Sequence, residues 1–170
     1  DSVAGWPRDS ATWRALRVAA KPPVALSVAE PVEGFDPDEF ARAQLNHVWN
    51  RGDLACLPDY YTADFAFTGP TDRQSLGIDA YAKFVLSIRE CFSDFQVQMD
   101  EVYWMGNVVT GFLISERWSA TATHTRDGLF GSPSGSVVQL WGITQQHIVD
   151  GKVIREWLLF NELDVMMQIA

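Results

Sequence analysis

Apolar side chains recur at helical spacing in two stretches of the first part of the chain. Residues 36–50 and 77–93 both place large apolar side chains three or four positions apart, which predicts two amphipathic helices. Asp36 is positioned to cap the first of them, with Pro37 in its first turn. A shorter helix is expected over residues 53–61.

After Asp94 the pattern changes to the alternation of apolar and polar residues that is typical of strands. Asp150-Gly151 is a two-residue hairpin signal, and a terminal helical turn is expected over residues 162–168. The predicted strands cover residues 64–70, 94–104, 108–123, 137–149 and 152–161.

Helices followed by an antiparallel meander are typical of an α+β fold. We expect a conical barrel, in which about three helices cover a strongly curved mixed or antiparallel sheet and a pocket lies between sheet and helices. This domain is expected to span residues 35–170. Residues 1–34 hold four of the eight prolines. They are expected to form an arm that packs on the domain or on a partner subunit, or else a flexible leader.

Composition restricts the classes of partner. The chain has 170 residues, 47% of them hydrophobic and 12% aromatic, which fits one globular domain with a bulky interior. Its net charge of -9 and its lack of any basic run argue against binding to nucleic acid or to an anionic membrane surface. No apolar stretch is long enough to span a bilayer.

Cys56 and Cys91 stand far apart in apolar surroundings, which predicts two buried thiols in a reducing, cytoplasmic compartment. No group of residues has clear metal-ligand spacing, although a loose set of Glu116, His124 and His147 is conceivable. The sequence shows neither a Ser/His/Asp motif nor a phosphate-binding glycine loop. No cofactor is therefore expected.

Several motifs resemble those of a known family. The run from Val48 to Pro70 contains a helix, an Asn-Arg-Gly-Asp turn and an Asp-Phe strand. The second half adds Arg117-Trp118, a Thr-His-Thr stretch, a Gly-x-Pro-x-Gly loop at 131–135 and the closing hairpin up to Trp157. Together they resemble the SnoaL-like polyketide cyclases of the nuclear transport factor two-like superfamily.

This resemblance implies a conical α+β barrel, a homodimer formed through the sheet, and a pocket for a hydrophobic small molecule. Polyketide cyclases of this family close a ring by aldol condensation without metal or cofactor, using an acidic residue near the end of the last strand. Here that position, four residues after Trp157, holds Asn161. An amide cannot take up a proton at neutral pH, but it can polarise a carbonyl or hold a water.

Glu116 and His147 are the candidates for the missing acid/base group. If the strand face that holds Ile114 and Trp118 is concave, Glu116 is a buried acid with a raised pKa; otherwise it forms a salt bridge, for example with Arg155. A strict two-residue turn places His147 on the face opposite to Trp157 and Asn161, whereas a bulged three-residue loop reverses this, so a pocket position and a sheet-surface position both stay open for His147. Glu156 alternates with Trp157 and should face away from it.

The remaining candidates would bind rather than catalyse. Trp118, Trp141 and Trp157 lie on three successive predicted strands and could line one cavity, where flat rings would stack on indole. Core packing is the alternative for at least one of them. His124 begins the glycine-rich loop, at the rim of the cone or exposed to solvent. His47 on the first helix is expected to be a packing residue, with a substrate contact as the alternative.

The sequence thus predicts a cofactor-independent enzyme of the SnoaL-like type that acts on a hydrophobic carbonyl compound by cyclisation, isomerisation or dehydration. His147, Glu116 and Asn161 would carry the chemistry. The alternative is a non-catalytic small-molecule-binding module or dimerisation domain, because Asn161 replaces the family's acid.

Overall fold

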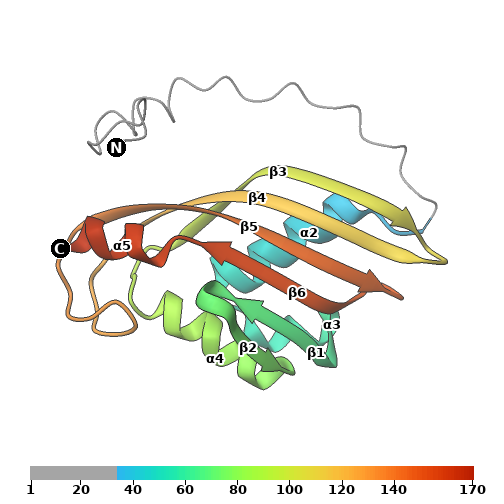
Figure 1. Cartoon of the computed structure of the whole chain (residues 1–170), viewed down its shortest axis with the longest axis horizontal. Helices are drawn as coiled ribbons and strands as arrows, with labels where there is room; N and C mark the ends of the chain where they lie inside the picture. The colour runs from blue at the N-terminus through green and yellow to red at the C-terminus, as the bar shows by residue number, and fades with distance from the viewer. Residues whose placement is uncertain (1–33) are drawn as a thin grey trace, which may run out of the picture. The chain divides into compact units, whose positions relative to one another are not determined.

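The structure is a computed structural model that describes residues 34–170, so the predicted arm lies outside the described residues except for Gly34. Six strands form one mixed, open sheet (Figure 1): β1 (Tyr61–Gly69), β2 (Arg73–Leu76), β3 (Gln96–Asn107), β4 (Gly111–Thr123), β5 (Val137–Val149) and β6 (Lys152–Phe160). Their order is β2-β1-β6-β5-β4-β3. Only β1 and β6 pair in parallel. The predicted α+β class with a curved mixed sheet is confirmed.

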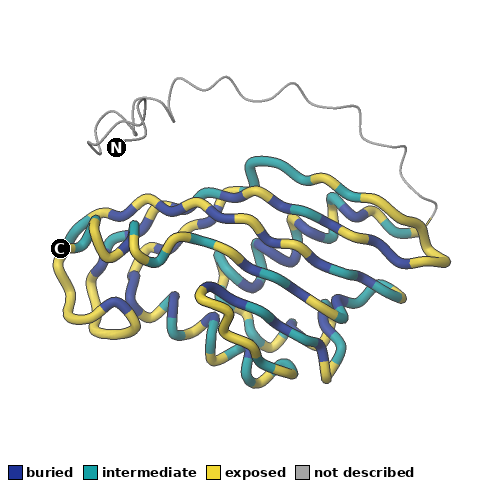
Figure 2. Tube along the Cα trace, viewed as in Figure 1, coloured by how far each residue is buried: buried dark blue, intermediate teal, exposed yellow. Residues whose placement is uncertain are grey.

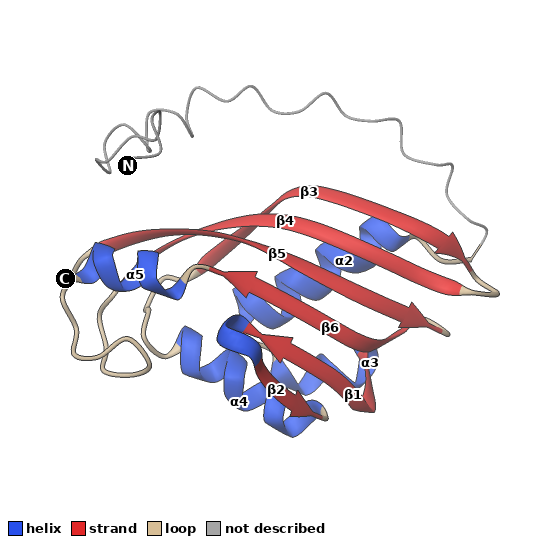
Figure 3. Cartoon of the chain, in the orientation of Figure 1, coloured by secondary structure: helices blue, strands red, loops and turns tan. Residues whose placement is uncertain are grey.

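Two helices, α2 (Pro37–Leu45) and α4 (Ile78–Arg89), cover one face of the sheet (Figure 3). The Asp36 carboxylate accepts hydrogen bonds from the backbone N–H groups of Asp38 and Glu39 at 2.9 and 3.2 Å, which confirms the predicted cap. A π-helical segment (Asn46–Arg51) continues α2 and ends at Gly52, whose φ of 67° suits a residue without a side chain. A 3-10 turn (Leu54–Cys56) and α3 (Leu57–Tyr60) replace the predicted short helix.

The hairpin between β5 and β6 determines which side chains face the helices. Val149 pairs with Lys152, so the turn at Asp150-Gly151 has two residues as predicted. Between His147 and Ile148 the register shifts by one residue, because Ile148 pairs with Val153 but His147 pairs with Arg155. Beyond this bulge each residue of β6 faces the side opposite to the one that a strict register would give it.

The two faces of the sheet differ in burial, as the alternating colours along the strands show (Figure 2). Along β4 and β5 the residues that face α2 and α4 are buried, whereas those on the other face are mostly half-buried or exposed. The buried face and the two helices together hold most of the hydrophobic core, including Phe65, Tyr81, Ile114 and Leu158.

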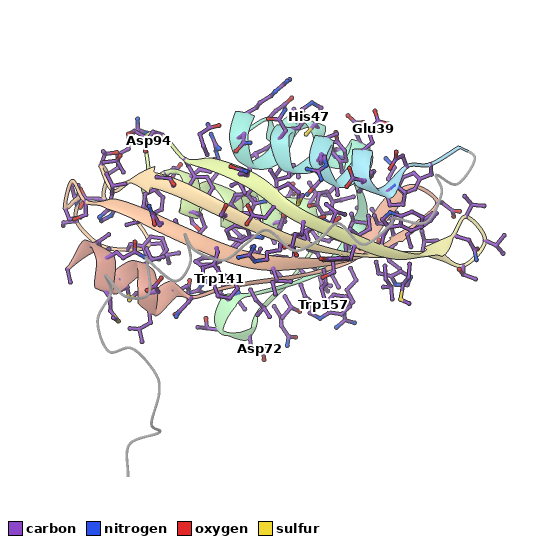
Figure 4. All side chains as sticks on the ribbon, turned by 90° about the horizontal axis from the view of Figure 1, so that it is seen from above. Glu39, His47, Asp72, Asp94, Trp141 and Trp157 are labelled. Atoms are coloured by element: carbon purple, nitrogen blue, oxygen red, sulfur yellow. The ribbon has the colours of Figure 1, made fainter. Side chains whose placement is uncertain are left out.

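The C-terminal helix α5 (Glu162–Ile169) lies on the side of the sheet opposite to α2 (Figure 4). Asn161 caps its start, since its side-chain oxygen accepts a hydrogen bond from the backbone N–H of Asp164 at 3.2 Å. The Gln168 amide bonds to both the N–H and the C=O of Gln139, at 2.8 and 2.9 Å. The Gln168 side chain thereby satisfies backbone hydrogen-bonding groups of β5 at a position where β6 has already ended.

Two elements differ from the expectation. The short edge strand β2 was not predicted, because three of its four residues, Arg73, Gln74 and Ser75, are polar. The turn after β3 lies at residues 108–110 rather than 105–107. Among residues 34–170, no helix has both the length and the apolar character that crossing a bilayer requires.

Candidate functional site

A cavity lies between the buried face of the sheet and the helices. Its empty volume, counting the part open to solvent, is about 460 Å³. Most of its wall is apolar or aromatic, with Trp49 from the π-helical segment and Phe95 among the contributors. The polar groups in the wall are Gln44, Glu116, Thr144 and Glu156. A largely apolar cavity with a few converging polar groups is the usual form of a small-molecule site.

Glu116 lies in the middle of β4, opposite Thr144 of β5, and is only 2% exposed. Its Oε1 atom is buried and has no hydrogen-bond partner among the described residues. Burial, followed by the nearby charge of Glu156, raises the pKa of Glu116 well above its ordinary value. Among the described residues no donor supports the ionised form of Glu116, so burial favours its protonated form.

Glu156 lies on β6 opposite Gln146 and is 1% exposed. Its Oε1 accepts a hydrogen bond from the Tyr81 hydroxyl, and its Oε2 accepts from the Tyr61 hydroxyl and the Gln146 amide, each at 2.8 Å. Burial raises the pKa of Glu156, but these three hydrogen bonds act in the opposite direction. The Gln44 amide donates to the Tyr61 hydroxyl and extends the network to α2.

The two carboxyl groups therefore have different environments at one cavity. Among the described residues Glu116 has no donor, so burial favours its protonated form, whereas Glu156 has three donors that stabilise its charge. A pair of acids whose pKa values are separated in this way can supply one proton donor and one proton acceptor. The arrangement is suited to acid–base chemistry on a bound ligand.

Trp118 forms an aromatic part of the cavity wall. Its indole N–H donates to the Thr144 hydroxyl at 3.0 Å, and its ring lies against Gly142, the residue opposite it on β5. A β-carbon at Gly142 would come within 2.3 Å of the indole ring, so only glycine leaves room for this packing. Trp118 is buried and lines the cavity.

The other two predicted tryptophans lie elsewhere. Trp141 and Trp157 are on the side of the sheet opposite to α2 (Figure 4). The Arg155 guanidinium lies over the Trp157 ring, 4.6 Å from its centroid. The expectation that three tryptophans line one cavity is therefore wrong for these two. Asn161, exposed at the start of α5, is also absent from the cavity wall. Its side-chain oxygen is engaged in capping the helix.

None of the three histidines lines the cavity. His147 is half-buried and pairs with Arg155 on the outer face of the sheet, as the bulge requires. His124 is fully buried and packs on Phe92, so the predicted solvent-exposed position is wrong. His47 hydrogen-bonds the Tyr60 hydroxyl at 2.8 Å, which is the packing arrangement expected for it. A role of these histidines in catalysis or binding stays a prediction.

The structure thus brings Glu116 and Trp118 together and adds Glu156, which was expected to face away from the pocket. That expectation took Trp157 as an inward residue, and the bulge in β6 exchanges the two faces. Tyr61 and Tyr81 were not singled out either, because isolated tyrosines at buried positions look like ordinary core residues. The available signal was the pair Gln146 and Glu156, two polar residues at buried strand positions.

Among the described residues, no group of three or more His, Cys, Asp or Glu side chains is arranged to hold a metal ion. Within the same range, Cys56 and Cys91 are free, and only Cys91 is fully buried.

The family model of the SnoaL-like polyketide cyclases matches residues 39–169 of the chain. Among curated protein sequences, none matches significantly.

Several solved structures share the fold. A protein from Jannaschia sp. CCS1, proposed to be a SnoaL-like polyketide cyclase, is 19% identical, with a TM-score of 0.66 over 81% of this chain and 96% of that one. IdmH from Streptomyces antibioticus, proposed to be a polyketide cyclase, is 17% identical, with a TM-score of 0.67 over 79% and 99%. AclR from Streptomyces galilaeus, proposed to be a hydroxylase, is 21% identical, with a TM-score of 0.64 over 79% and 82%.

Proposed function

Because the chain belongs to the SnoaL-like polyketide cyclase family, we propose that it is a cofactor-independent acid–base enzyme acting on a hydrophobic carbonyl compound. The observation that carries this proposal is Glu116, a buried carboxyl group without a partner at a cavity that Glu156 also lines. Burying a polar group without a hydrogen-bond partner costs free energy unless a bound ligand supplies the partner. A ligand oxygen in the cavity would provide the missing hydrogen bond.

In the proposed reaction the substrate carbonyl oxygen accepts a hydrogen bond from protonated Glu116. Glu156 removes a proton from the carbon next to that carbonyl, so the C–H bonding pair becomes the enolate. Glu116 stabilises the developing negative charge on oxygen, as a carboxylic acid kept neutral by burial can. In a cyclisation the enolate carbon attacks a second carbonyl of the same molecule, and the new alkoxide takes the proton that Glu156 removed, which returns Glu156 to its ionised form.

The apolar wall supports a hydrophobic substrate. The aromatic side chains of Trp49, Phe95, Trp118 and Phe160 offer flat surfaces to a ring system and no charge to attract an ionic one. Two carboxyl groups at the same cavity would also disfavour an anionic ligand. Isomerisation and dehydration begin with the same proton transfer, so the site geometry is compatible with them too.

We also propose that the protein forms a homodimer through the outer face of the sheet. Trp141, Ile143 and Leu159 are 41%, 38% and 61% exposed there, and Ile143 pairs directly with Leu159. Large apolar side chains grouped on one exposed face are typical of a surface that another protein covers.

The reaction is tested by following exchange of α-protons in buffered D₂O by NMR, with 2-acetylnaphthalene and an aryl β-keto ester as probes. We expect the protein to accelerate exchange, Glu156→Gln to abolish the acceleration, and Glu116→Gln to reduce it by about 10²-fold or more. Glu90→Gln, at an exposed carboxylate, is the matched control.

Binding of each probe is measured in parallel by quenching of tryptophan fluorescence. If a probe binds but neither Glu variant changes its rate of exchange, the proposed chemistry is wrong. That result would favour the non-catalytic binding module.

A further inference from the structure

The hydroxyl groups of Tyr61 and Tyr81 and the carboxyl group of Glu156 form a closed triangle. The two tyrosine–carboxylate distances are 2.8 Å, and the two hydroxyl oxygens are 3.2 Å apart. All three residues are at most 1% exposed, and they come from three different elements, β1, α4 and β6. Water therefore has little access to any of the three sides.

The triangle can form a complete set of hydrogen bonds in both protonation states of Glu156. When Glu156 is ionised, each tyrosine donates its only O–H hydrogen to the carboxylate, so no hydrogen remains for the contact between the two hydroxyls. When Glu156 is protonated, its O–H can donate to Tyr81, Tyr81 to Tyr61, and Tyr61 back to the carboxyl group. Both states are fully hydrogen-bonded, and only O–H bonds rotate between them.

The neighbouring amides keep the triangle in place in both states. The Gln44 amide donates to the Tyr61 oxygen, and the Gln146 amide donates to Oε2 of Glu156 at 2.8 Å. Neither donation competes with the hydrogens that rotate. The acidic or basic groups that act on Glu156 are the two tyrosines and, from β4, Glu116. Burial and the charge of Glu156 raise the pKa of both tyrosines well above 10, so both remain neutral donors.

We propose that Tyr61 and Tyr81 are positioning residues that allow Glu156 to take up and return a proton inside the fold while every hydrogen of these three groups stays hydrogen-bonded. This inference rests on the proposed function for its purpose, since a base that removes a substrate proton must hold it until it is returned. A single buried carboxylate without such partners would lose or gain a full hydrogen bond at each transfer. The triangle removes that penalty.

The experiment is a pH titration of the Glu156 carboxyl carbon by ¹³C NMR in protein labelled at glutamate, with the signal assigned by its loss in Glu156→Gln. It needs no substrate, so it can succeed or fail independently of the proposed reaction. The variants are Tyr61→Phe, Tyr81→Phe and the double variant. Tyr103→Phe removes an exposed tyrosine–carboxylate bond, to Glu101, and serves as the control.

Each single variant should raise the pKa of Glu156 by about half a unit to one unit, because the carboxylate loses a donor. Each also breaks the ring of the protonated state, which partly offsets that rise. The closed set of three hydrogen bonds in the protonated state is lost with the first substitution, so the second substitution brings no further offset. The double variant should therefore shift the pKa of Glu156 by more than the sum of the shifts in the two single variants. Tyr103→Phe should leave the titration unchanged.

A double shift equal to the sum would overturn the proposal in favour of two independent donors, and an unchanged pKa would overturn it as well. If the double variant does not fold, uniform 3-fluorotyrosine in the unsubstituted chain replaces it. Fluorination makes the phenols stronger donors and should lower the pKa of Glu156. An unchanged or raised pKa there would contradict the proposal.

Discussion

At the scale of single residues, Glu116 couples the stability of the protein to pH. Folding raises its pKa, so between the unfolded and folded values the folded state binds more protons than the unfolded state. Stability conferred by this group is fully present below the unfolded pKa and is lost as the pH rises through the folded value. Glu116→Gln removes this slope because a glutamine does not titrate.

We therefore expect the free energy of unfolding of Glu116→Gln to increase relative to that of the unsubstituted protein as the pH rises from about 5 to about 8. Urea unfolding at several pH values in this range measures the difference. Glu156 also titrates, but it is present in both proteins, so its contribution to the pH dependence of their difference in stability largely cancels. Glu90→Gln should show a constant difference. A constant difference for Glu116→Gln too would mean that Glu116 is not a protonated buried acid.

Asn161 occupies a motif position and also has a structural use. Its side chain caps α5, so Asn161→Ala should lower the free energy of unfolding by about 1 kcal/mol. Asn161→Asp keeps a capping oxygen and should be nearly neutral. Thermal unfolding of both variants measures the cap. Rates of α-proton exchange should be unchanged in both, and their loss in a folded Asn161→Ala protein would show that Asn161 acts on the substrate.

At the scale of secondary structure, local chemistry predicted most elements. The Asp36 cap, the Asp150-Gly151 turn and the limits of β5 follow from short-range rules, and the structure has all three. The bulge in β6 follows from no local signal, because Val153, Ile154 and Arg155 read as an ordinary strand. Yet this shift of the β5–β6 register by one residue makes Glu156, rather than Trp157, face the cavity.

The candidate site was accordingly only half predictable. Glu116 and Trp118 lie on β4, where simple alternation holds from Phe112 to the end of the strand, and their shared face could be predicted. The two tyrosine partners of Glu156 come from β1 and α4, and they are separated from it by 95 and 75 positions in the chain. Contacts of this range are set by how the elements pack.

Gly142 connects strand packing to the cavity. An added β-carbon would lie 2.3 Å from the Trp118 ring and 2.5 Å from the backbone oxygen of Leu159. Gly142→Ala should therefore move the indole, separate β5 locally from β6, and cost about 1–3 kcal/mol of stability. Urea unfolding and quenching of tryptophan fluorescence by 2-acetylnaphthalene would measure both effects.

Ser115→Ala, on the outer face of β4, is the matched small-residue control and should change neither stability nor binding strongly. Unchanged stability in Gly142→Ala would show that the strands have more freedom to separate than this packing implies.

At the scale of the whole molecule, the open sheet gives its two faces different tasks. The face under α2 and α4 holds both buried carboxyl groups, and the other face carries the exposed apolar side chains around Ile143 and Leu159. Because side chains alternate along a strand, the same residues of β5 and β6 that fix the cavity also fix the outer surface. A change of register would therefore alter the cavity wall and the outer surface together.

The outer face of the sheet is the proposed dimer interface. If two copies associate through it, Leu159→Lys places a charge in an apolar interface and should weaken dimerisation by about 100-fold or more. Light scattering over a range of protein concentrations would show a dimer for the unsubstituted chain and a monomer for Leu159→Lys.

Val109→Lys is the matched control, because Val109 is 89% exposed in the turn between β3 and β4, away from the Ile143–Leu159 pair. It should leave the dimer intact. A dimer that survives Leu159→Lys but dissociates in Val109→Lys would place the interface at the β3–β4 turn. A monomer at every concentration of the unsubstituted chain would mean that the outer face has another partner. Since the cavity opens between sheet and helices, α-proton exchange should persist in a folded Leu159→Lys monomer.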